Sequence, residues 1–374
     1  MLLLSVANAE PYIPKDDATV LERAPAAEAT RRLEPLRRML IADPTDFASA
    51  LQLAQGYLTI GRETADPRFT SYAQATIAPW LQAVDPPAAA LVLQATVLQS
   101  SHQFDASLSM LDRALRIEPG NAQAWLTRAT VLQVQGKFAL ARQSCGNLLR
   151  TAGQAIAISC IANVNSLNGK LEQSYRSLRQ LHEVSQSSSA DIRGWMLGQL
   201  GEMAVRMGDP QAAEKYFLAA MQATPGDIYL KAAYADLLLA QNRHEAVIAL
   251  LQENEQQDVL LLRLAIAGKR LQSPEAKRWS DSFEARYLAA QRGGDSSHLR
   301  EYARFLLDVR GDPRKALEVA RRNWRVQREP ADVHVYLMAA TAANSSDGAA
   351  EVTAWIRENG YEDRTLPAAG KTTS

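Results

Sequence analysis

The sequence predicts an all-α fold, a solenoid of successive helical hairpins, and three observations support this prediction. The pentapeptide Ala-Thr-Val-Leu-Gln occurs at Ala95–Gln99 and again at Ala129–Gln133, 34 residues later, with Phe104 and Phe138 in the same register. Small residues recur at this period along most of the chain. No run of alternating apolar and polar residues suggests a strand, and a composition with only 6% aromatic residues suits closely packed helices.

Each repeat can be numbered so that the small residue of its first helix is position 8 and the residue that ends this helix is position 15. One repeat then has Trp125 at position 4, Ala129 at 8, Gly136 at 15, Phe138 at 17 and Ala141 at 20. The two alanines must be small because the helices cross there, and glycine ends a helix by adopting the left-handed conformation without penalty. This pattern resembles the tetratricopeptide repeat over most of the chain.

The resemblance implies a right-handed α-solenoid of about eight helical hairpins that forms a single elongated domain. We expect an opening helix at Ala26–Ala42, a solenoid over 26–374 and a loose end at Tyr361–Ser374. The clearest repeats are 88–121, 122–154, 155–188, 194–227 and 228–257. Degenerate repeats occupy 43–85, 258–292, 297–330 and 331–360, with a loop insertion in the first and longer turns expected at Pro274 and Pro313.

The N-terminal segment carries a second signal. Met1–Ala9 is a short apolar run that ends in Ala7-Asn8-Ala9, the small-residue pattern after which signal peptidase cuts. The run is short and no basic residue precedes it, and an upstream start would supply both features. We therefore expect 1–9 to be the remnant of a signal peptide, and the proline-containing segment 10–25 to be an extended arm. The alternative is an ordinary N-terminus of a cytoplasmic protein.

The two cysteines bear on the same question. Cys145 falls on the second helix of one repeat and Cys160 on the first helix of the next, and these helices should pack together. In an oxidising compartment they could form a disulfide if their Cα atoms lie within about 7 Å. The alternative is a pair of buried thiols that act as small apolar side chains.

The resemblance also implies a binding surface. In tetratricopeptide proteins, the first helix of each repeat lines a concave groove through positions near 2, 5, 9, 12 and 13. These positions hold mostly uncharged hydrogen-bonding residues, namely Thr96, Gln99, Thr130, Gln133, Ser159, Asn163, Ser166, Gln199, Glu202, Arg206 and Asp236. We expect them to bind a protein or peptide partner, although they would equally serve to solvate the inner face.

The formal charge is zero, but it is unevenly distributed along the chain. The segment 207–258 is acidic and the segment 299–330 is basic, and in the latter Arg321, Arg325 and Arg328 fall on one helical stripe beside Trp324. This stripe could be a docking patch for an acidic partner, or simply a solvated helix face. A more basic domain would be needed for nucleic-acid binding, which we do not expect.

Catalytic and metal-binding patterns are missing from the sequence. The histidines are dispersed, none has another at i, i+4 spacing, and neither cysteine has a histidine nearby in sequence. Glu202 and Asp236 suggest paired carboxylates, but without a nucleophile or cofactor motif we interpret them as groove residues. No segment has the ~20 apolar residues needed to span a bilayer. We therefore expect no cofactor, no metal and no integral membrane segment.

Three segments, Ala124–Gln133, Ala320–Asp332 and Asn359–Asp363, resemble a group of uncharacterised bacterial tetratricopeptide proteins. This resemblance implies a bacterial envelope setting. The leading hypothesis is a non-enzymatic, exported scaffold that binds a partner in its groove during envelope assembly or transport, with a periplasmic location. The alternatives are a cytoplasmic regulatory adaptor and an enzyme with an atypical site within the array.

Overall fold

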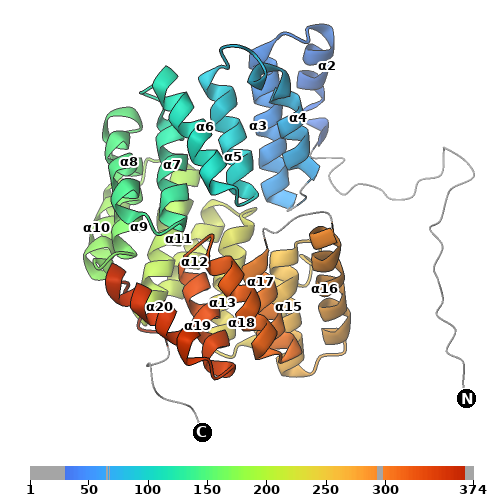
Figure 1. The fold of residues 1–374 in the computed structure, drawn as a ribbon, viewed down its shortest axis with the longest axis vertical. Helices are drawn as coiled ribbons and strands as arrows, with labels where there is room; N and C mark the ends of the chain where they lie inside the picture. Colours follow the sequence, from blue (N-terminus) through green and yellow to red (C-terminus); the bar gives the residue numbers. More distant parts are fainter. Residues whose placement is uncertain (1–29, 65, 67, 293–297, 367–374) are drawn as a thin grey trace, which may run out of the picture.

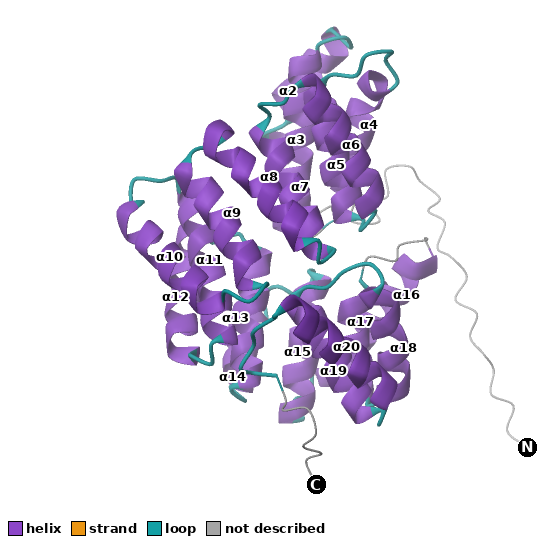
Figure 2. Cartoon of the chain, turned by 60° about the vertical axis from the view of Figure 1, so that its left-hand side comes forward, coloured by secondary structure: helices purple, strands orange, loops and turns teal. Residues whose placement is uncertain are grey.

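The structure of the protein is a computed structural model that describes residues 30–366, apart from 65, 67 and 293–297. This part of the chain is helical and contains no strand, which confirms the predicted all-α class (Figures 1 and 2). The predicted signal remnant at 1–9 and the arm at 10–25 lie outside the described residues, as does the start of the predicted opening helix.

The helices follow one another in chain order with short turns between them. They are α2 (Glu34–Ala42), α3 (Phe47–Thr64), α4 (Arg68–Leu81), α5 (Ala88–Ser100), α6 (Phe104–Ile117), α7 (Ala122–Val134), α8 (Phe138–Thr151), α9 (Gln154–Ser166), α10 (Leu171–Val184), α11 (Ala190–Arg206), α12 (Pro210–Ala223), α13 (Ile228–Ala240), α14 (His244–Leu251), α15 (Asp258–Leu271), α16 (Ala276–Arg292), α17 (Leu299–Phe305), η1 (Leu306–Arg310), α18 (Pro313–Trp324), α19 (Pro330–Ala342) and α20 (Ser346–Asn359).

The helices pack as successive pairs, and the repeat register marks where the two helices of a pair come closest. Every segment that the sequence assigns to a repeat contains such a pair, for example α5 with α6 and α7 with α8. The position-8 residues Ala95 and Ala235 are completely buried. At Gly201, which holds the same position, a Cβ atom would come within 2.7 Å of the Phe217 ring in the paired helix. A larger side chain at position 8 would therefore force the two helices apart.

A residue in the left-handed conformation ends most of the first helices at position 15. Gly136 has a φ of 74°, and Asn242 and Gln272 take the same position with φ values of 57° and 53°. Asparagine tolerates this conformation better than most residues because its side chain can hydrogen-bond locally. The turn between the helices thus keeps one geometry while the residue type changes. This explains why the repeat pattern becomes harder to recognise in the sequence beyond residue 242.

The repeat at 297–330 departs from this register. Gly311, which has a φ of 68°, lies one position later relative to Ala303 than the regular spacing gives. The extra residue is accommodated by η1, a single π-helical turn at the end of α17. The prediction of a longer turn at Pro313 is wrong, because the additional residue lies within the helix and Pro313 begins α18 directly after Asp312.

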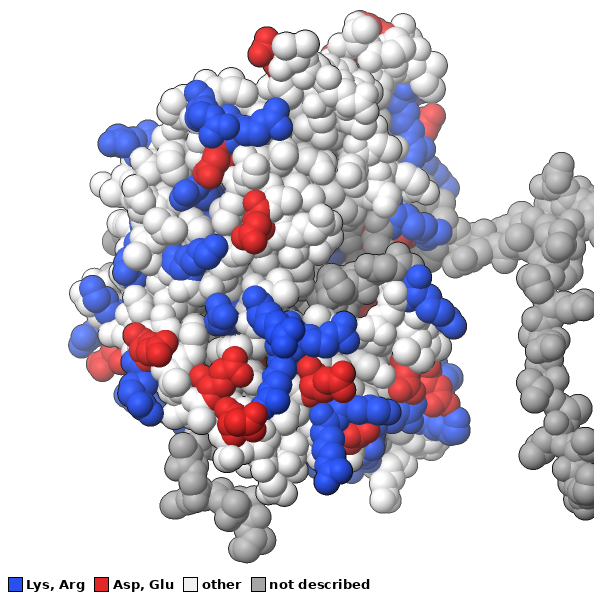
Figure 3. All heavy atoms as spheres, viewed as in Figure 1, with Lys and Arg blue, Asp and Glu red and all other residues white. Residues whose placement is uncertain are grey.

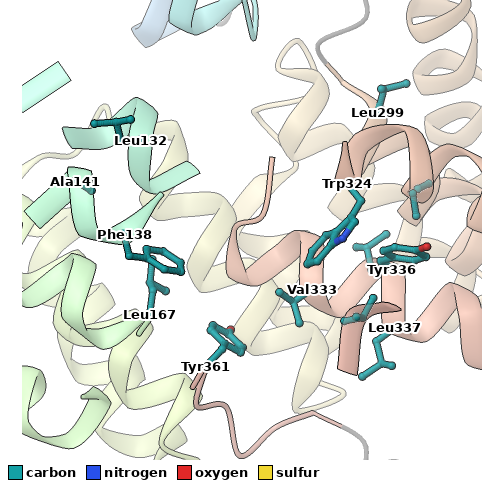
Figure 4. Close-up of a cluster of buried hydrophobic side chains, with 14 of the residues drawn as sticks. Leu132, Phe138, Ala141, Leu167, Leu299, Trp324, Val333, Tyr336, Leu337 and Tyr361 are labelled. Atoms are coloured by element: carbon teal, nitrogen blue, oxygen red, sulfur yellow. The ribbon is translucent and has the colours of Figure 1, made fainter. Parts of the chain in front are cut away.

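The last helices pack back against the middle of the array, so the solenoid closes on itself (Figures 1 and 2). One buried hydrophobic cluster contains side chains from α7 to α9 and from α17 to α20. In Figure 4, Phe138 and Leu167 on one side face Trp324, Val333 and Tyr361 on the other. We call this contact the seam. It joins Arg328 and residues 355–364 to the helix turns at 134–136, 168–171 and 206–208.

Polar contacts reinforce the seam and fix the chain beyond α20. The side chain of Asn168 donates to the carbonyl of Asn359 at 2.6 Å, and the backbone N–H of Arg364 donates to the carbonyl of Arg206 at 2.8 Å. Tyr361 is only 5% exposed. The prediction that Tyr361–Ser374 forms a loose end is therefore wrong for residues 361–366, because tertiary packing of an aromatic ring holds a segment that has no repeat pattern of its own.

Candidate binding surface on the inner face

The first helices of the pairs share one side of the array, which we call the inner face. It is formed by α3, α5, α7, α9, α11, α13, α15, α17 and α19. Each of these helices contacts the next one in the series, whereas successive second helices lie further apart. This difference curves the array and places the first helices on its concave side.

Every side chain predicted for the groove comes from one of these first helices, but the structure gives them different exposures. Ser159, Ser166, Gln199 and Arg206 are buried. Their burial leaves them out of reach of a partner. A partly buried set remains along the inner face, consisting of Thr96, Gln99, Thr130, Gln133, Asn163, Glu202 and Asp236.

The uncharged members of this set lie on α5, α7 and α9. The hydroxyl groups of Thr96 and Thr130 donate to carbonyl groups one turn earlier in their own helices. The side chain of Asn163 donates to the Gln133 side-chain oxygen at 3.2 Å, which links α9 to α7. This part of the inner face therefore offers short polar side chains, one after another, in the order of the repeats.

Arg206 belongs to the seam and not to an open groove. Its guanidinium donates to the carbonyl and the hydroxyl of Ser166 at 2.6 and 2.7 Å. It also lies over the ring of Tyr361, 5.8 Å from the ring centre. With 4% of its surface exposed, the side chain cannot reach a ligand on the inner face. Its role is to hold α9, α11 and the C-terminal segment together.

A ladder of ion pairs crosses α13, α15 and α17 on the same face. The carboxylate of Asp236 accepts from Arg263 at 2.6 Å and from Arg304 at 2.5 Å. Burial alone would raise the pKa of Asp236, but the charges of the two arginines outweigh it and hold that pKa below its usual range. The acidic segment 207–258 and the basic segment 299–330 of the sequence therefore meet in one ion-pair network.

A second network surrounds Arg300 where α17 meets the start of α19. Its guanidinium lies 2.8 Å from Glu329, 3.2 Å from Glu301 and 3.5 Å from Asp332. Glu329 and Asp332 also form a capping box, in which the side chain of each residue accepts from the backbone N–H of the other. Burial raises the pKa of Asp332, and the charge of Arg300 opposes this shift.

Glu202 on α11 differs from the other inner-face carboxylates because its hydrogen-bond partner is neutral. Its carboxylate accepts from the phenol of Tyr229 on α13. Among the ion pairs of the described residues, none includes Glu202. Burial raises the pKa of Glu202, and the hydrogen bond from Tyr229 opposes this without cancelling it. Tyr229 nevertheless exposes 60% of its surface, so its ring is accessible to water beside the carboxylate that it binds.

Two functional candidates, Arg300 and Arg304, were missed in the sequence analysis. Both hold groove positions if the register is continued from Ala303 as position 8, since Arg300 is then position 5 and Arg304 position 9. Glu202 and Asp236 hold position 9 in their own repeats. The signal was therefore present in the sequence, but the predicted groove residues extended only to Asp236.

The three arginines predicted to form a basic docking patch have different surroundings. Arg321 is bound to Asp347 and to the hydroxyl of Tyr336. Arg328 lies over the Trp324 ring and donates to the carbonyl of Gln135 in the seam. Arg325 is exposed. Figure 3 shows charges of both signs interleaved over α18 to α20, and not a single basic area.

The structure pairs Cys145 on α8 with Cys160 on α9 in a disulfide, with the Cα atoms 5.5 Å apart. This separation meets the geometric condition set out from the sequence. Both residues lie in the hydrophobic cluster that forms the seam. The bond therefore ties two adjacent repeats together at the point where the last helices pack against them.

The chemistry offered by the inner face is that of hydrogen bonding and charge. Within the described part of the chain, no group of three or more histidine, cysteine, aspartate or glutamate side chains is placed to hold a metal ion. No described helix has the length and apolar character to cross a bilayer.

Of the comparisons with known proteins, those with solved structures bear on the fold. No family model and no curated protein matches the sequence. Among solved structures, human IFIT1 with PPP-AAAA is 14% identical, covers 89% of this chain and 79% of its own, and has a TM-score of 0.50. A monomeric IFIT1 mutant with Gppp-AAAA has 14% identity, coverages of 89% and 77%, and a TM-score of 0.51. A tetratricopeptide repeat protein from Parabacteroides merdae is 15% identical, with coverages of 69% and 93% and a TM-score of 0.40. The chain has a tetratricopeptide-like fold.

Proposed function

We propose that this tetratricopeptide-like array is a non-enzymatic scaffold that binds an extended segment of a partner protein along its inner face. The observation that carries the proposal is the alignment of position-9 side chains on successive first helices, Thr96, Thr130, Asn163, Glu202 and Asp236. A row of hydrogen-bonding groups that follows the repeat suits a ligand that itself repeats, as a polypeptide backbone does.

We further propose that the protein is exported and acts at a bacterial envelope, in assembly or transport. The disulfide between Cys145 and Cys160 supports this, because disulfides persist in oxidising compartments such as the periplasm. The Ala7-Asn8-Ala9 pattern at the start of the sequence points the same way. A cytoplasmic regulatory adaptor is the competing proposal, and in that case both thiols would be reduced in cells.

Site-specific photo-crosslinking tests the binding surface. A photoreactive amino acid at Gln99 or Thr130 would sample the inner face, and one at Glu318, exposed on the second helix α18, would serve as the outer control. Arg206 should be left intact because its substitution would disturb the seam. The full chain would be incubated with an envelope extract of the native host. A partner crosslinked from the inner positions and not from Glu318 supports the proposal, whereas the reverse pattern overturns it.

Oligonucleotides are the alternative ligand class, since IFIT1, whose fold is similar, was solved with PPP-AAAA. The same crosslinking variants distinguish the two classes. Nuclease treatment of the extract should leave the crosslinked product unchanged if the partner is a protein.

A further inference from the structure

We infer that the segment bound by the inner face is basic, and that Glu202 and Tyr229 receive one of its lysine or arginine side chains. This inference rests on the proposed function, because it specifies the chemistry of the partner at that same surface.

The arginines of the two ion-pair networks are already occupied. Arg263 and Arg304 share Asp236, and Arg304 also reaches Asp308. Arg300 is surrounded by carboxylates at 2.8 to 3.5 Å. An incoming anion would have to displace one of these partners, and truncating or exchanging a partner in a desolvated pair is costly.

Within these networks, the carboxylates outnumber the guanidinium groups. The charged side chains of these networks, together with Arg206 and Glu202, are six carboxylates (Glu202, Asp236, Glu301, Asp308, Glu329 and Asp332) and four guanidinium groups (Arg206, Arg263, Arg300 and Arg304), a formal charge of 4 − 6 = −2. Glu202 is the one among these carboxylates that has no ion pair in the described structure. Arg206, one turn further along α11, is held by Ser166 behind the inner face and does not neutralise Glu202 directly.

The partner of Glu202 adds a second recognition element. Tyr229 exposes 60% of its surface beside the carboxylate that it binds. A cation that approaches Glu202 can therefore also lie against the aromatic ring, and cation–π attraction is strengthened where the cation is partly desolvated. Arg206 and Arg300 act on Glu202 with positive charges, and Glu329, which is itself paired with Arg300, acts with a negative one. The case for a cation at this point therefore depends on the missing ion pair of Glu202 and on the exposed ring of Tyr229.

Partial burial of Glu202 should strengthen the binding of a cation at this site. A carboxylate whose charged form is penalised by its surroundings gains more from a counter-charge than one that is fully hydrated. A lysine or arginine side chain would supply that counter-charge. A phosphate-bearing ligand would instead meet an uncompensated negative charge at this point, which disfavours an oligonucleotide as the occupant.

The test is a binding titration of the full-length protein by fluorescence anisotropy. The probes are labelled, terminally blocked peptides of equal length in which serine alternates with lysine, with glutamate or with glutamine, together with a labelled oligoadenylate. We expect the lysine peptide to bind most tightly and its affinity to fall as the salt concentration rises. Glu202→Gln should weaken this binding about tenfold, while Glu318→Gln, the same change at an exposed site on α18, should leave it unchanged.

Tyr229 variants separate the ring from the phenol group. Tyr229→Phe keeps the aromatic ring and should retain most of the binding, whereas Tyr229→Ala should weaken it several-fold. Unfolding midpoints of all variants, measured in the same buffer, exclude loss of folding as the cause of weaker binding.

Other outcomes overturn the inference in distinguishable ways. If the glutamine peptide binds as tightly as the lysine peptide and Glu202→Gln has no effect, the basic preference is wrong while inner-face crosslinking of a partner still stands. If oligoadenylate binds and is displaced by none of the peptides, the ligand class is wrong. If the lysine peptide shows no binding up to about 1 mM, the basic segment is rejected, and the crosslinking experiment alone then decides the proposed function.

Discussion

The guanidinium of Arg206 lies 5.8 Å from the centre of the Tyr361 ring, and this contact joins the middle of the array to the segment that follows its last helix. The same arginine is fixed from the other side by Ser166. The contact therefore connects α9, α11 and the C-terminal segment, and it makes Tyr361 a test of whether the seam stabilises the whole fold.

Tyr361→Ala should lower the free energy of unfolding by about 3 kcal/mol, because it removes a buried aromatic ring and leaves a cavity. Urea denaturation followed by circular dichroism measures this change. Tyr361→Phe is the control, since it keeps the ring and loses only the hydrogen bond from the phenol to Asp363 at 3.1 Å. Equal stability of the alanine and phenylalanine variants would contradict the packing described at the seam.

Reduction of the disulfide between Cys145 and Cys160 should also destabilise the protein. The bond closes a loop with a sequence separation of 15 residues, for which loop-closure entropy gives about 3 kcal/mol. The measurement compares urea midpoints with and without a reductant. The Cys145→Ala/Cys160→Ala variant, unfolded in the same way, should be insensitive to the reductant. Detection of two free thiols in the non-reduced, denatured protein would refute the bond.

Replacing each of two helical glycines with alanine should change the stability of the protein in opposite directions. At Gly201 the new Cβ would lie 2.7 Å from the Phe217 ring, so Gly201→Ala should cost about 1–3 kcal/mol. At Gly146 no atom lies within 4 Å of the new Cβ, so Gly146→Ala should stabilise α8 by about 0.5–1 kcal/mol. Thermal unfolding measures the change in stability of each variant relative to the parent protein. A destabilised Gly146→Ala variant would show that α8 is packed more closely than described.

The repeat register made the helical pairs predictable from sequence, because crossing alanines and left-handed turn residues follow local steric rules. It failed at Gly311 and Pro313, where an extra residue was taken into a π-helical turn that no local signal marks. The seam was not predictable either. It depends on the curvature accumulated over many repeats, and residues such as Phe138 and Tyr361 meet only after that curvature has brought them together.

The candidate surface was predictable in part for the same reason. Position 9 gave residues that lie partly buried on first helices, such as Asn163 and Glu202, but position alone does not tell a buried side chain from a reachable one. Arg206 occupies a groove position and yet is buried by the C-terminal segment. Its burial follows from closure of the array, and the sequence pattern of a single repeat carries no information about that closure.

The ion pair between Asp236 and Arg304 should couple α13 to α17. In a double-mutant cycle of Asp236→Asn and Arg304→Gln, we expect a coupling energy of about 1 kcal/mol in the free energy of unfolding. The two groups are 2.5 Å apart and only partly exposed, so salt should screen them weakly. A parallel cycle on Arg179 and Glu183, an exposed pair on α10, should give a coupling close to zero. Equal coupling in the two cycles would argue against a special role of the inner-face pair.

Glu301 should make stability depend on pH. Burial would raise its pKa, but the charge of Arg300 brings the pKa down to about 2, compared with an ordinary value of 4.5. A carboxyl group with a depressed pKa stabilises the fold above its unfolded pKa and loses this contribution as the pH falls towards its folded pKa. The difference in unfolding midpoint between the parent and Glu301→Gln should therefore be large at about pH 7 and shrink towards about pH 3. A difference that stays constant over this range would contradict the shift.

Closure of the array also determines when parts of the chain can complete their packing during synthesis. In an open repeat array each unit can fold against its predecessor as soon as it emerges. Here the apolar surface around Phe138 and Leu167 must wait for partners that include Trp355 and Tyr361, which come much later in the sequence. A nascent chain that has not yet reached these residues therefore displays an apolar surface that is later hidden, and chaperones or proteases can recognise it.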